Sequence, residues 1–252
     1  MPQPENGVRP EAGGGVFATT HWSVVLTARD GGGTEASAAL ERLCRMYWPP
    51  LYAFIRREGH NETEAKDLTQ DFFLRLIDRE FLQRLRHQDG KFRSFLLTFL
   101  KHFLMEQRGK GKAQKRGGGK VILSLEQLAE QGSYLNEPVD DMSPDQVFER
   151  RWAQTVFQAA LNRLREEYAS AGKTEFFDLL KDLQPRESGA PSYAEIGARF
   201  GMTEAAVKSA VQRMRARHRE ILRKEIAQTV MRPDEIDEEI RHLREVLSGQ
   251  GK

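Results

Sequence analysis

Seven basic side chains lie close together near the C-terminal end of the sequence, between residues 207 and 224, where Glu220 is the only acid. Guanidinium and ammonium groups bind phosphate oxygens, so such a cluster is typical of a nucleic-acid contact. The whole chain of 252 residues has 39 Lys and Arg against 37 Asp and Glu, a net charge of only +2. The indication of nucleic-acid binding therefore comes from the local clustering of these cations, because the net charge of the whole chain indicates neither an acidic nor a basic partner.

Small and amide side chains lie between these cations. If residues 203–224 form one helix, its inner face carries Val207, Val211, Met214, His218 and Ile221. Its outer face then presents Ala205, Ser209, Gln212 and Ala216. A narrow face of this kind fits the major groove, where hydroxyl and amide groups contact base edges while the flanking cations hold phosphates.

The preceding residues supply the parts that would position this helix. Ser192 and Glu195 have the spacing of a capping box at the start of a short helix over 193–200. Gly201 then provides a turn, and Thr203 is placed to cap the second helix. We predict a helix-turn-helix whose DNA contacts are Thr203, Glu204, Ala205, Lys208, Ser209, Gln212, Arg213, Arg215 and Arg219. The alternative is a solvated basic helix in an ordinary bundle.

Two further helices have contrasting outer faces. On the helix expected from Asn61 to about Arg79, an acidic face carries Asp67, Gln70, Asp71, Leu74 and Asp78. It suits a basic protein partner, and equally suits plain solvation. On the helix expected over 92–108, the outer face carries Arg93, Leu97, Lys101, Leu104 and Arg108. Leucines between cations fit a surface that holds phosphates beside unpaired bases, although burial on most sides is the alternative.

The periodicity predicts helices almost throughout and no convincing strand, so we expect an all-α protein of two small domains joined by a flexible linker. The expected division has five parts. It places a mostly disordered N-terminal extension with a short helix at 1–34, a helical domain at 35–108, a linker at 109–145, the helix-turn-helix domain at 146–224 and an amphipathic helical extension at 225–252.

No enzyme chemistry emerges from the residue types. The six histidines are scattered without metal-ligand spacing, no phosphate-cradling glycine motif precedes a Lys-Ser or Lys-Thr pair, and the single cysteine, Cys44, excludes an internal disulfide framework. We therefore expect no catalytic activity, no metal and no cofactor. Because no apolar stretch approaches the ~20 residues that cross a bilayer, we also expect a cytoplasmic protein without membrane insertion.

The order of motifs resembles a known family. The runs 47–54 (YWPPLYAF), 67–76 (DLTQDFFLRL) and 92–96 (FRSFL) closely resemble region 2 of extracytoplasmic-function (ECF) sigma factors of the sigma-70 family, and residues 193–219 resemble their region 4. The resemblance covers about residues 35–224, and the extensions on either side resemble a longer subgroup. Two motifs in order across a linker are more specific than either alone.

The resemblance implies a promoter-specificity subunit that binds core RNA polymerase and directs it to −35 and −10 promoter elements. The helix-turn-helix would recognise the −35 element, and the acidic face Asp67, Gln70, Asp71, Leu74 and Asp78 would bind the polymerase clamp helices. The melted −10 strand would be captured by the loop at 86–91 and by Arg93, Leu97, Lys101, His102, Met105 and Arg108. His102 and Glu106 depart from residues common in the family, so no −10 base preference is carried over.

Other interpretations stay open from the sequence. A stand-alone repressor or activator would use the same helix-turn-helix without polymerase, and it would have no need of the acidic face. The C-terminal extension could pack on region 4, bind a regulator or restrain DNA binding. An anti-sigma factor or another regulator is a further partner that the resemblance allows.

Overall fold

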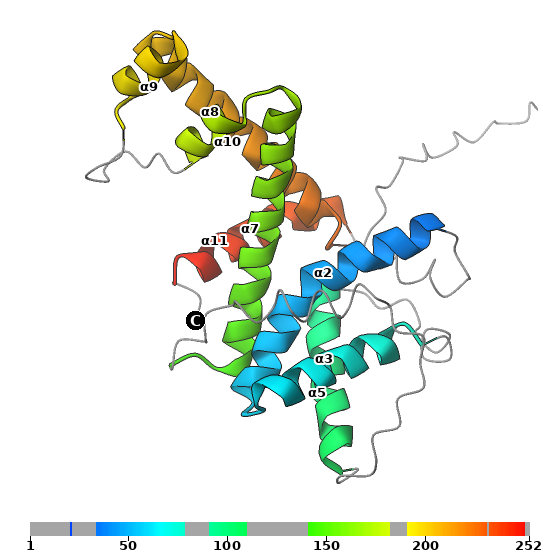
Figure 1. Cartoon of the computed structure of the whole chain (residues 1–252). Helices are drawn as coiled ribbons and strands as arrows, with labels where there is room; N and C mark the ends of the chain where they lie inside the picture. The colour runs from blue at the N-terminus through cyan, green and yellow to red at the C-terminus, as the bar shows by residue number, and fades with distance from the viewer. Residues whose placement is uncertain are drawn as a thin grey trace, which may run out of the picture.

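The computed structural model describes residue 21 and residues 34–78, 91–109, 141–181, 191–230 and 232–249. Within these ranges every regular element is helical, as expected for an all-α protein. The elements are α2 (Thr34–Arg57), α3 (Glu62–Leu76), α5 (Phe92–Gly109), α7 (Pro144–Ser170), α8 (Thr174–Lys181), α9 (Tyr193–Phe200), α10 (Glu204–Ala227), the 3-10 helix η1 (Pro233–Glu235) and α11 (Ile236–Leu247). Figure 1 shows their arrangement.

The first hydrophobic core forms between α2, α3 and α5. Its largest members are aromatic, and Trp48 stacks on Phe73 with ring centroids 5.8 Å apart. The helix α2 continues through Pro49 and Pro50. At the start of α3, Asn61 and Glu64 form the expected capping box, which fixes where this helix begins.

The long helix α7 belongs to both cores. Phe148, Trp152 and Val156, in its first half, are buried in the first core against α2. Further along the same helix, Ala160 and Leu164 are buried in a second core with α8, α9 and α10. Figure 1 shows α7 running from the side of α2 up to α8 and α10. A single continuous helix therefore fixes the two cores relative to each other.

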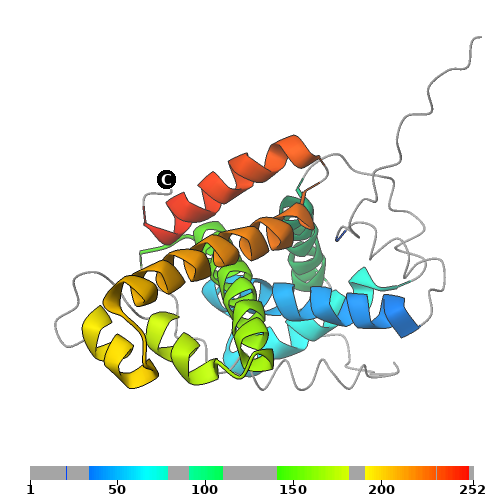
Figure 2. The same cartoon turned by 90° about the horizontal axis from the view of Figure 1, so that it is seen from above.

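The segment after residue 224 packs on the first core. Leu243 of α11 is buried there, and its partly buried neighbours on the same stripe are Ile236, Ile240, Val246 and Leu247. Ile226, at the end of α10, is fully buried in the same core. Figure 2 shows α10 and α11 lying side by side above α7. The amphipathic helix expected at the C-terminal end thus covers the first core rather than standing apart.

The packing differs in two ways from the division expected at 146 and 225. The expected division places the first half of α7 in the helix-turn-helix domain, whereas this half is buried in the first core. It also gives the segment after 224 as an extension, whereas this segment completes the same core. The physical reason is that helix periodicity identifies an apolar stripe without identifying its partner. The short helix and disorder expected before residue 34, and most of the linker, lie outside the described residues apart from His21.

His21 is buried beside α2. Its Nδ1 lies 3.2 Å from the Tyr47 hydroxyl, and its backbone N–H donates to the Gln228 carbonyl at 2.8 Å. Burial lowers the pKa of His21 to about 4, so the ring is neutral at pH 7.

None of the described helices is both long enough and apolar enough to span a bilayer.

Candidate nucleic-acid interface

Local hydrogen bonds hold α9 and α10 in a helix-turn-helix. The Ser192 hydroxyl accepts from the Glu195 N–H at 3.2 Å, and the Glu195 carboxylate accepts from the Ser192 N–H at 2.7 Å. The Ser192 N–H and the Ser192 hydroxyl both donate to the Glu195 carboxylate, which lowers the pKa of this carboxyl. Gly201 ends α9 in the left-handed region at φ 64°, and the Thr203 hydroxyl accepts from the Ala206 N–H at 3.2 Å. The predicted capping box, turn glycine and N-cap are all confirmed.

Gly197 is a further requirement of this turn that the sequence did not indicate. Its carbonyl accepts from the Met202 N–H at 2.8 Å, which brings the turn back onto α9. A Cβ atom at Gly197 would lie 2.5 Å from the Met202 carbonyl oxygen, so no larger residue fits without movement of the backbone. A glycine inside a short helix, where it serves no capping role, is the signal that could have identified it.

The two faces of α10 are divided as predicted. Val207, Val211, Met214 and Ile221 are buried in the second core, while His218 is half-buried with its ring 4.8 Å from that of Phe157. On the opposite face, Ala205, Ser209 and Gln212 are exposed and Ala216 is partly exposed. The outward face is therefore free of bulky side chains.

The cations of α10 divide into two sets. Arg217 is 2.6 Å from Glu167 of α7, and Arg223 pairs with Asp237 of α11, so these two side chains connect α10 to its neighbours. Arg213, Arg215 and Arg219 are exposed. Lys208 is also exposed, 2.6 Å from Glu204 one turn earlier.

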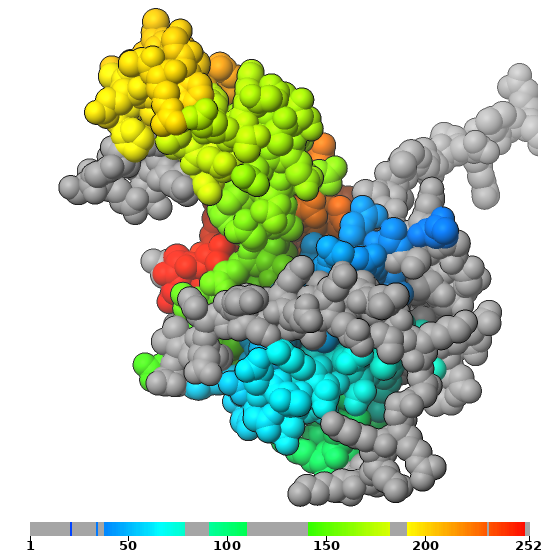
Figure 3. Space-filling model, in the orientation of Figure 1, coloured from blue at the N-terminus to red at the C-terminus, as the bar shows by residue number. Residues whose placement is uncertain are grey.

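Figure 3 shows the yellow surface of the helix-turn-helix end of the chain far from the cyan surface of α3.

The outer face predicted for α5 is wrong at two of its five positions. Arg93 is only 6% exposed and Leu104 only 3%, while Leu97 is partly buried against the first core. Side chains of α7 and α11 cover Arg93 at the beginning of α5, and Leu104, near its other end, is part of the first core, so the helix has no single apolar stripe. The other predicted strand contacts are exposed: Lys101, His102, Met105 and Arg108.

The exposed cations of α5 are paired with acids. Lys101 pairs with Asp145 at the start of α7, and Arg108 lies 2.6 Å from Glu58. Met105, between them, is 58% exposed and is one of only two large apolar side chains exposed among the described residues. The tip of α5 thus combines charge with one accessible apolar group.

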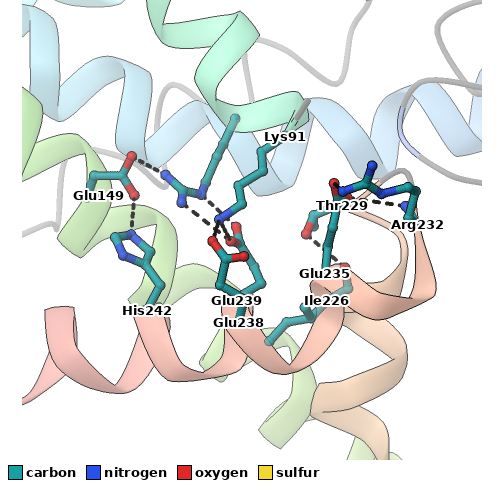
Figure 4. A network of polar contacts seen from close by, with 10 residues as sticks. Lys91, Glu149, Ile226, Thr229, Arg232, Glu235, Glu238, Glu239 and His242 are labelled. Carbon is teal, nitrogen blue, oxygen red and sulfur yellow. Dashed lines mark hydrogen bonds and ion pairs between the residues drawn. The ribbon is translucent and has the colours of Figure 1, made fainter. Parts of the chain in front are cut away.

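Arg93 is the centre of a buried polar network that joins α5, α7 and α11. Its Nε lies 2.7 Å from Glu239 of α11, its guanidinium pairs with Glu149 of α7, and it stacks 4.9 Å from the ring centre of Trp152. Lys91 is 2.8 Å from the same Glu239 carboxylate. Figure 4 shows the labelled members of this network from close by.

The charges in the network stabilise one another. Burial alone raises the pKa of Glu239, but hydrogen bonds and charges from Arg93 and Lys91 outweigh it, so the net pKa of this carboxyl is lowered. Burial likewise opposes the charge on Arg93, yet Glu239 and Glu149 raise its pKa overall. Both groups are therefore charged at neutral pH, although they are buried.

The acidic face of α3 is accessible in part. Asp71 and Asp78 are exposed, while Asp67, Gln70 and Leu74 are partly exposed. The buried side of the helix is formed by Ala65, Thr69, Phe72, Phe73 and Leu76. The structure thus keeps Asp67, Gln70, Asp71 and Leu74 on the outer side of α3, whereas Asp78 lies just after the helix, which ends at Leu76 rather than near Arg79. Among the described residues, no group of three or more metal-ligating side chains is close enough to hold a metal ion.

Comparison with known proteins identifies the first core. Residues 43–112 match the family model for sigma-70 region 2, a range that spans the end of α2, all of α3 and all of α5. Region 2 is thus the class of domain that this core represents. The chain is also similar to the ECF RNA polymerase sigma factor SigE of Mycolicibacterium smegmatis, at 27% identity over 198 residues, covering 79% of this chain and 67% of the relative.

No solved structure gives a significant match to the chain. The region 2 match and the helical architecture agree, and over most of its length the chain is similar to a sigma factor of the ECF type. Both comparisons support a sigma subunit role in transcription initiation.

Proposed function

We propose that this chain is the promoter-specificity subunit of an RNA polymerase holoenzyme and that it has no catalytic activity of its own. The helix α10 recognises the −35 element, α5 captures the melted −10 strand, and the acidic face of α3 binds the clamp helices of core polymerase. The single observation that best supports this proposal is the exposed small face of α10, with Ser209 and Gln212 flanked by cations. It adds duplex recognition to the region 2 domain.

On the −35 element, α10 divides its work between two kinds of contact. Ser209 and Gln212 have the donors and acceptors that distinguish base edges in the major groove, and Ala205 leaves room for a thymine methyl group. Arg213, Arg215 and Arg219 supply charge that holds phosphates without regard to sequence. Thr203 and Glu204, at the N-terminal end of α10, lie where a recognition helix first meets the groove.

On the −10 element, the tip of α5 supplies the contacts. Lys101 and Arg108 hold phosphates of the single strand, and Met105 and His102 lie exposed between them for contact with unstacked bases. Single-stranded DNA has accessible base faces, so apolar and ring side chains gain more there than on a duplex. Leu97, which is partly exposed, extends this surface toward the start of α5, whereas Arg93 is buried.

The interaction with polymerase separates this function from that of a stand-alone regulator. Asp71 is exposed and Asp67 partly exposed on the outer side of α3, away from the core that Phe72 and Phe73 fill. Exchanging the two acids for lysine reverses the charge of this face without changing a fully buried side chain. Like charges across an interface disfavour association.

A pull-down with core polymerase tests this assignment. We expect the double variant Asp67→Lys/Asp71→Lys to lose at least about tenfold in affinity for core polymerase, since each reversed rim charge costs of order 1 kcal/mol. The control is Glu166→Lys, an exposed acid on α7 far along the chain from α3. Unchanged capture of the double variant contradicts the polymerase assignment and favours the stand-alone regulator.

A further inference from the structure

We propose that α11 is an autoinhibitory latch on the strand-binding helix α5. It holds Arg93 in a buried ion pair and Lys91 in partly exposed ones, and DNA gains these two cations only after α11 has moved away. This inference rests on the proposed function, because it assigns a regulated state to the same −10 surface.

The contacts at Glu239 define the closed state. Glu239 has no exposed surface, and its two carboxylate oxygens lie 2.7 Å from Arg93 Nε and 2.8 Å from Lys91 Nζ. Glu238, the preceding residue, lies 3.1 Å from Lys91. Figure 4 shows Lys91 reaching these two acids of α11. A carboxylate placed between two cations occupies the positions that a phosphate would take.

The helix α7 completes the closure from the other side. Glu149 pairs with Arg93 through one oxygen and lies 2.9 Å from His242 of α11 through the other. Asp145, one turn earlier on α7, pairs with Lys101 of α5. Three cations of the proposed strand-binding surface therefore meet carboxylates of α7 and α11 in place of DNA.

The backbone after α10 also contacts α5. The Phe92 N–H, at the first residue of α5, donates to the Thr229 carbonyl at 3.3 Å. Thr229 follows α10 directly, and its hydroxyl donates to the Ile226 carbonyl at 2.8 Å. The end of the −35 recognition helix and the start of the −10 helix are thus joined by the same short segment that leads into α11.

The ion pairs of α11 compete with DNA for Arg93, and they can be broken when α11 moves away. Buried carboxylates fix Arg93 on two sides, so binding of DNA to Arg93 must break at least one charged pair. The apolar stripe of α11 is largely half-buried, with Leu243 as its one fully buried apolar residue. The other contacts of α11 are partly buried apolar side chains and polar pairs near the surface, so the helix can leave while the core formed by α2, α3 and α5 stays intact.

Replacement of the central acid tests the latch. In Glu239→Gln the side chain keeps its size and one acceptor oxygen, the second oxygen is replaced by an NH2 donor, and Arg93 keeps Glu149, so the fold is retained while the double ion pair is lost. Fluorescence anisotropy with a labelled single-stranded oligonucleotide of mixed sequence measures binding to the full chain. We expect the affinity to rise about fivefold or more. The salt dependence should steepen by about one phosphate contact or more.

The control variant is Glu245→Gln. Glu245 is exposed on the same helix, and its replacement changes the net charge by the same amount. A second variant, Arg93→Gln/Glu239→Gln, should lose most of the gain, because the released cation is then absent. Equal affinities of Glu239→Gln and Glu245→Gln overturn the latch, since added positive charge alone would account for both.

Hydrogen exchange of the backbone of α11 separates the failure of the latch from the failure of the proposed function. We expect faster exchange over 236–247 in Glu239→Gln and in the wild-type chain at saturating oligonucleotide. Protection that stays unchanged in both overturns the latch and leaves the proposed function standing. Faster exchange in the variant without any gain in affinity contradicts the assignment of strand binding to α5, and the latch with it.

Discussion

Gly197 determines how closely α9 and the turn before α10 approach each other. The hydrogen bond between Met202 and Gly197 places the Met202 carbonyl where a side chain on residue 197 would begin. The packing of the whole helix-turn-helix depends on this contact, because Ile196 beside it is buried in the second core. The absence of a side chain at residue 197 therefore allows the close approach that positions the recognition helix.

We expect Gly197→Ala to lower the free energy of unfolding by about 1–3 kcal/mol, since the new methyl group meets backbone rather than a flexible side chain. Thermal denaturation followed by circular dichroism measures the loss. The matched control is Gly109→Ala at the end of α5, where a Cβ meets nothing within 4 Å and the change should be neutral or slightly stabilising. Equal melting temperatures for Gly197→Ala and the wild type would show that the turn tolerates the shift.

The burial of Arg93 is a feature that the sequence of α5 alone could not predict. Its spacing with Lys101 and Arg108 predicts three cations on one exposed face, but Arg93 is buried, and the acids that pair with it lie 56 and 146 residues further along the chain. Nothing local to α5 distinguishes a cation that meets solvent from one that meets Glu239. The buried pairs thus became visible only when the chain was folded.

The helix α10 is the element whose two faces could be predicted in full. Its apolar residues recur at the helical period, Thr203 caps it and Gly201 ends the helix before it, and these are properties of adjacent residues. The same local logic predicted the capping box of α3. By contrast, the stripe of α11 was predicted without its partner, because amphipathicity gives a face and not the surface that it covers.

At the level of α10, substitutions should separate recognition of bases from binding of phosphates. We expect Gln212→Ala to change the preferred base at one −35 position, with about 1–3 kcal/mol of discrimination lost. We expect Arg213→Ala to weaken all sequences alike and to reduce the salt slope by about one. Selection from a randomised −35 library by the holoenzyme measures both effects. An altered base preference in Arg213→Ala with none in Gln212→Ala would reverse the roles that we assign to these residues.

In the whole molecule, α7 and α11 pack the segments that carry the two sequence motifs into one folded unit. The first half of α7 and the end of α10 are both buried in the core that contains region 2, so α5 and α10 are held in a fixed relation. The sequence could predict the two motifs and their order. It could not predict this closure, because Trp152 and Ile226 look like core residues of any helical domain, and only packing shows which core they join.

The central claim is that the chain directs polymerase to promoters, and mapping of transcript starts tests it most directly. Purified chain and core polymerase are incubated with genomic DNA, and the 5′ ends of the transcripts are sequenced, with Asp67→Lys/Asp71→Lys as the matched control. We expect a small set of starts that share two upstream sequence elements, present with the wild-type chain and lost with the variant. The same distribution of starts with and without the wild-type chain would contradict the account.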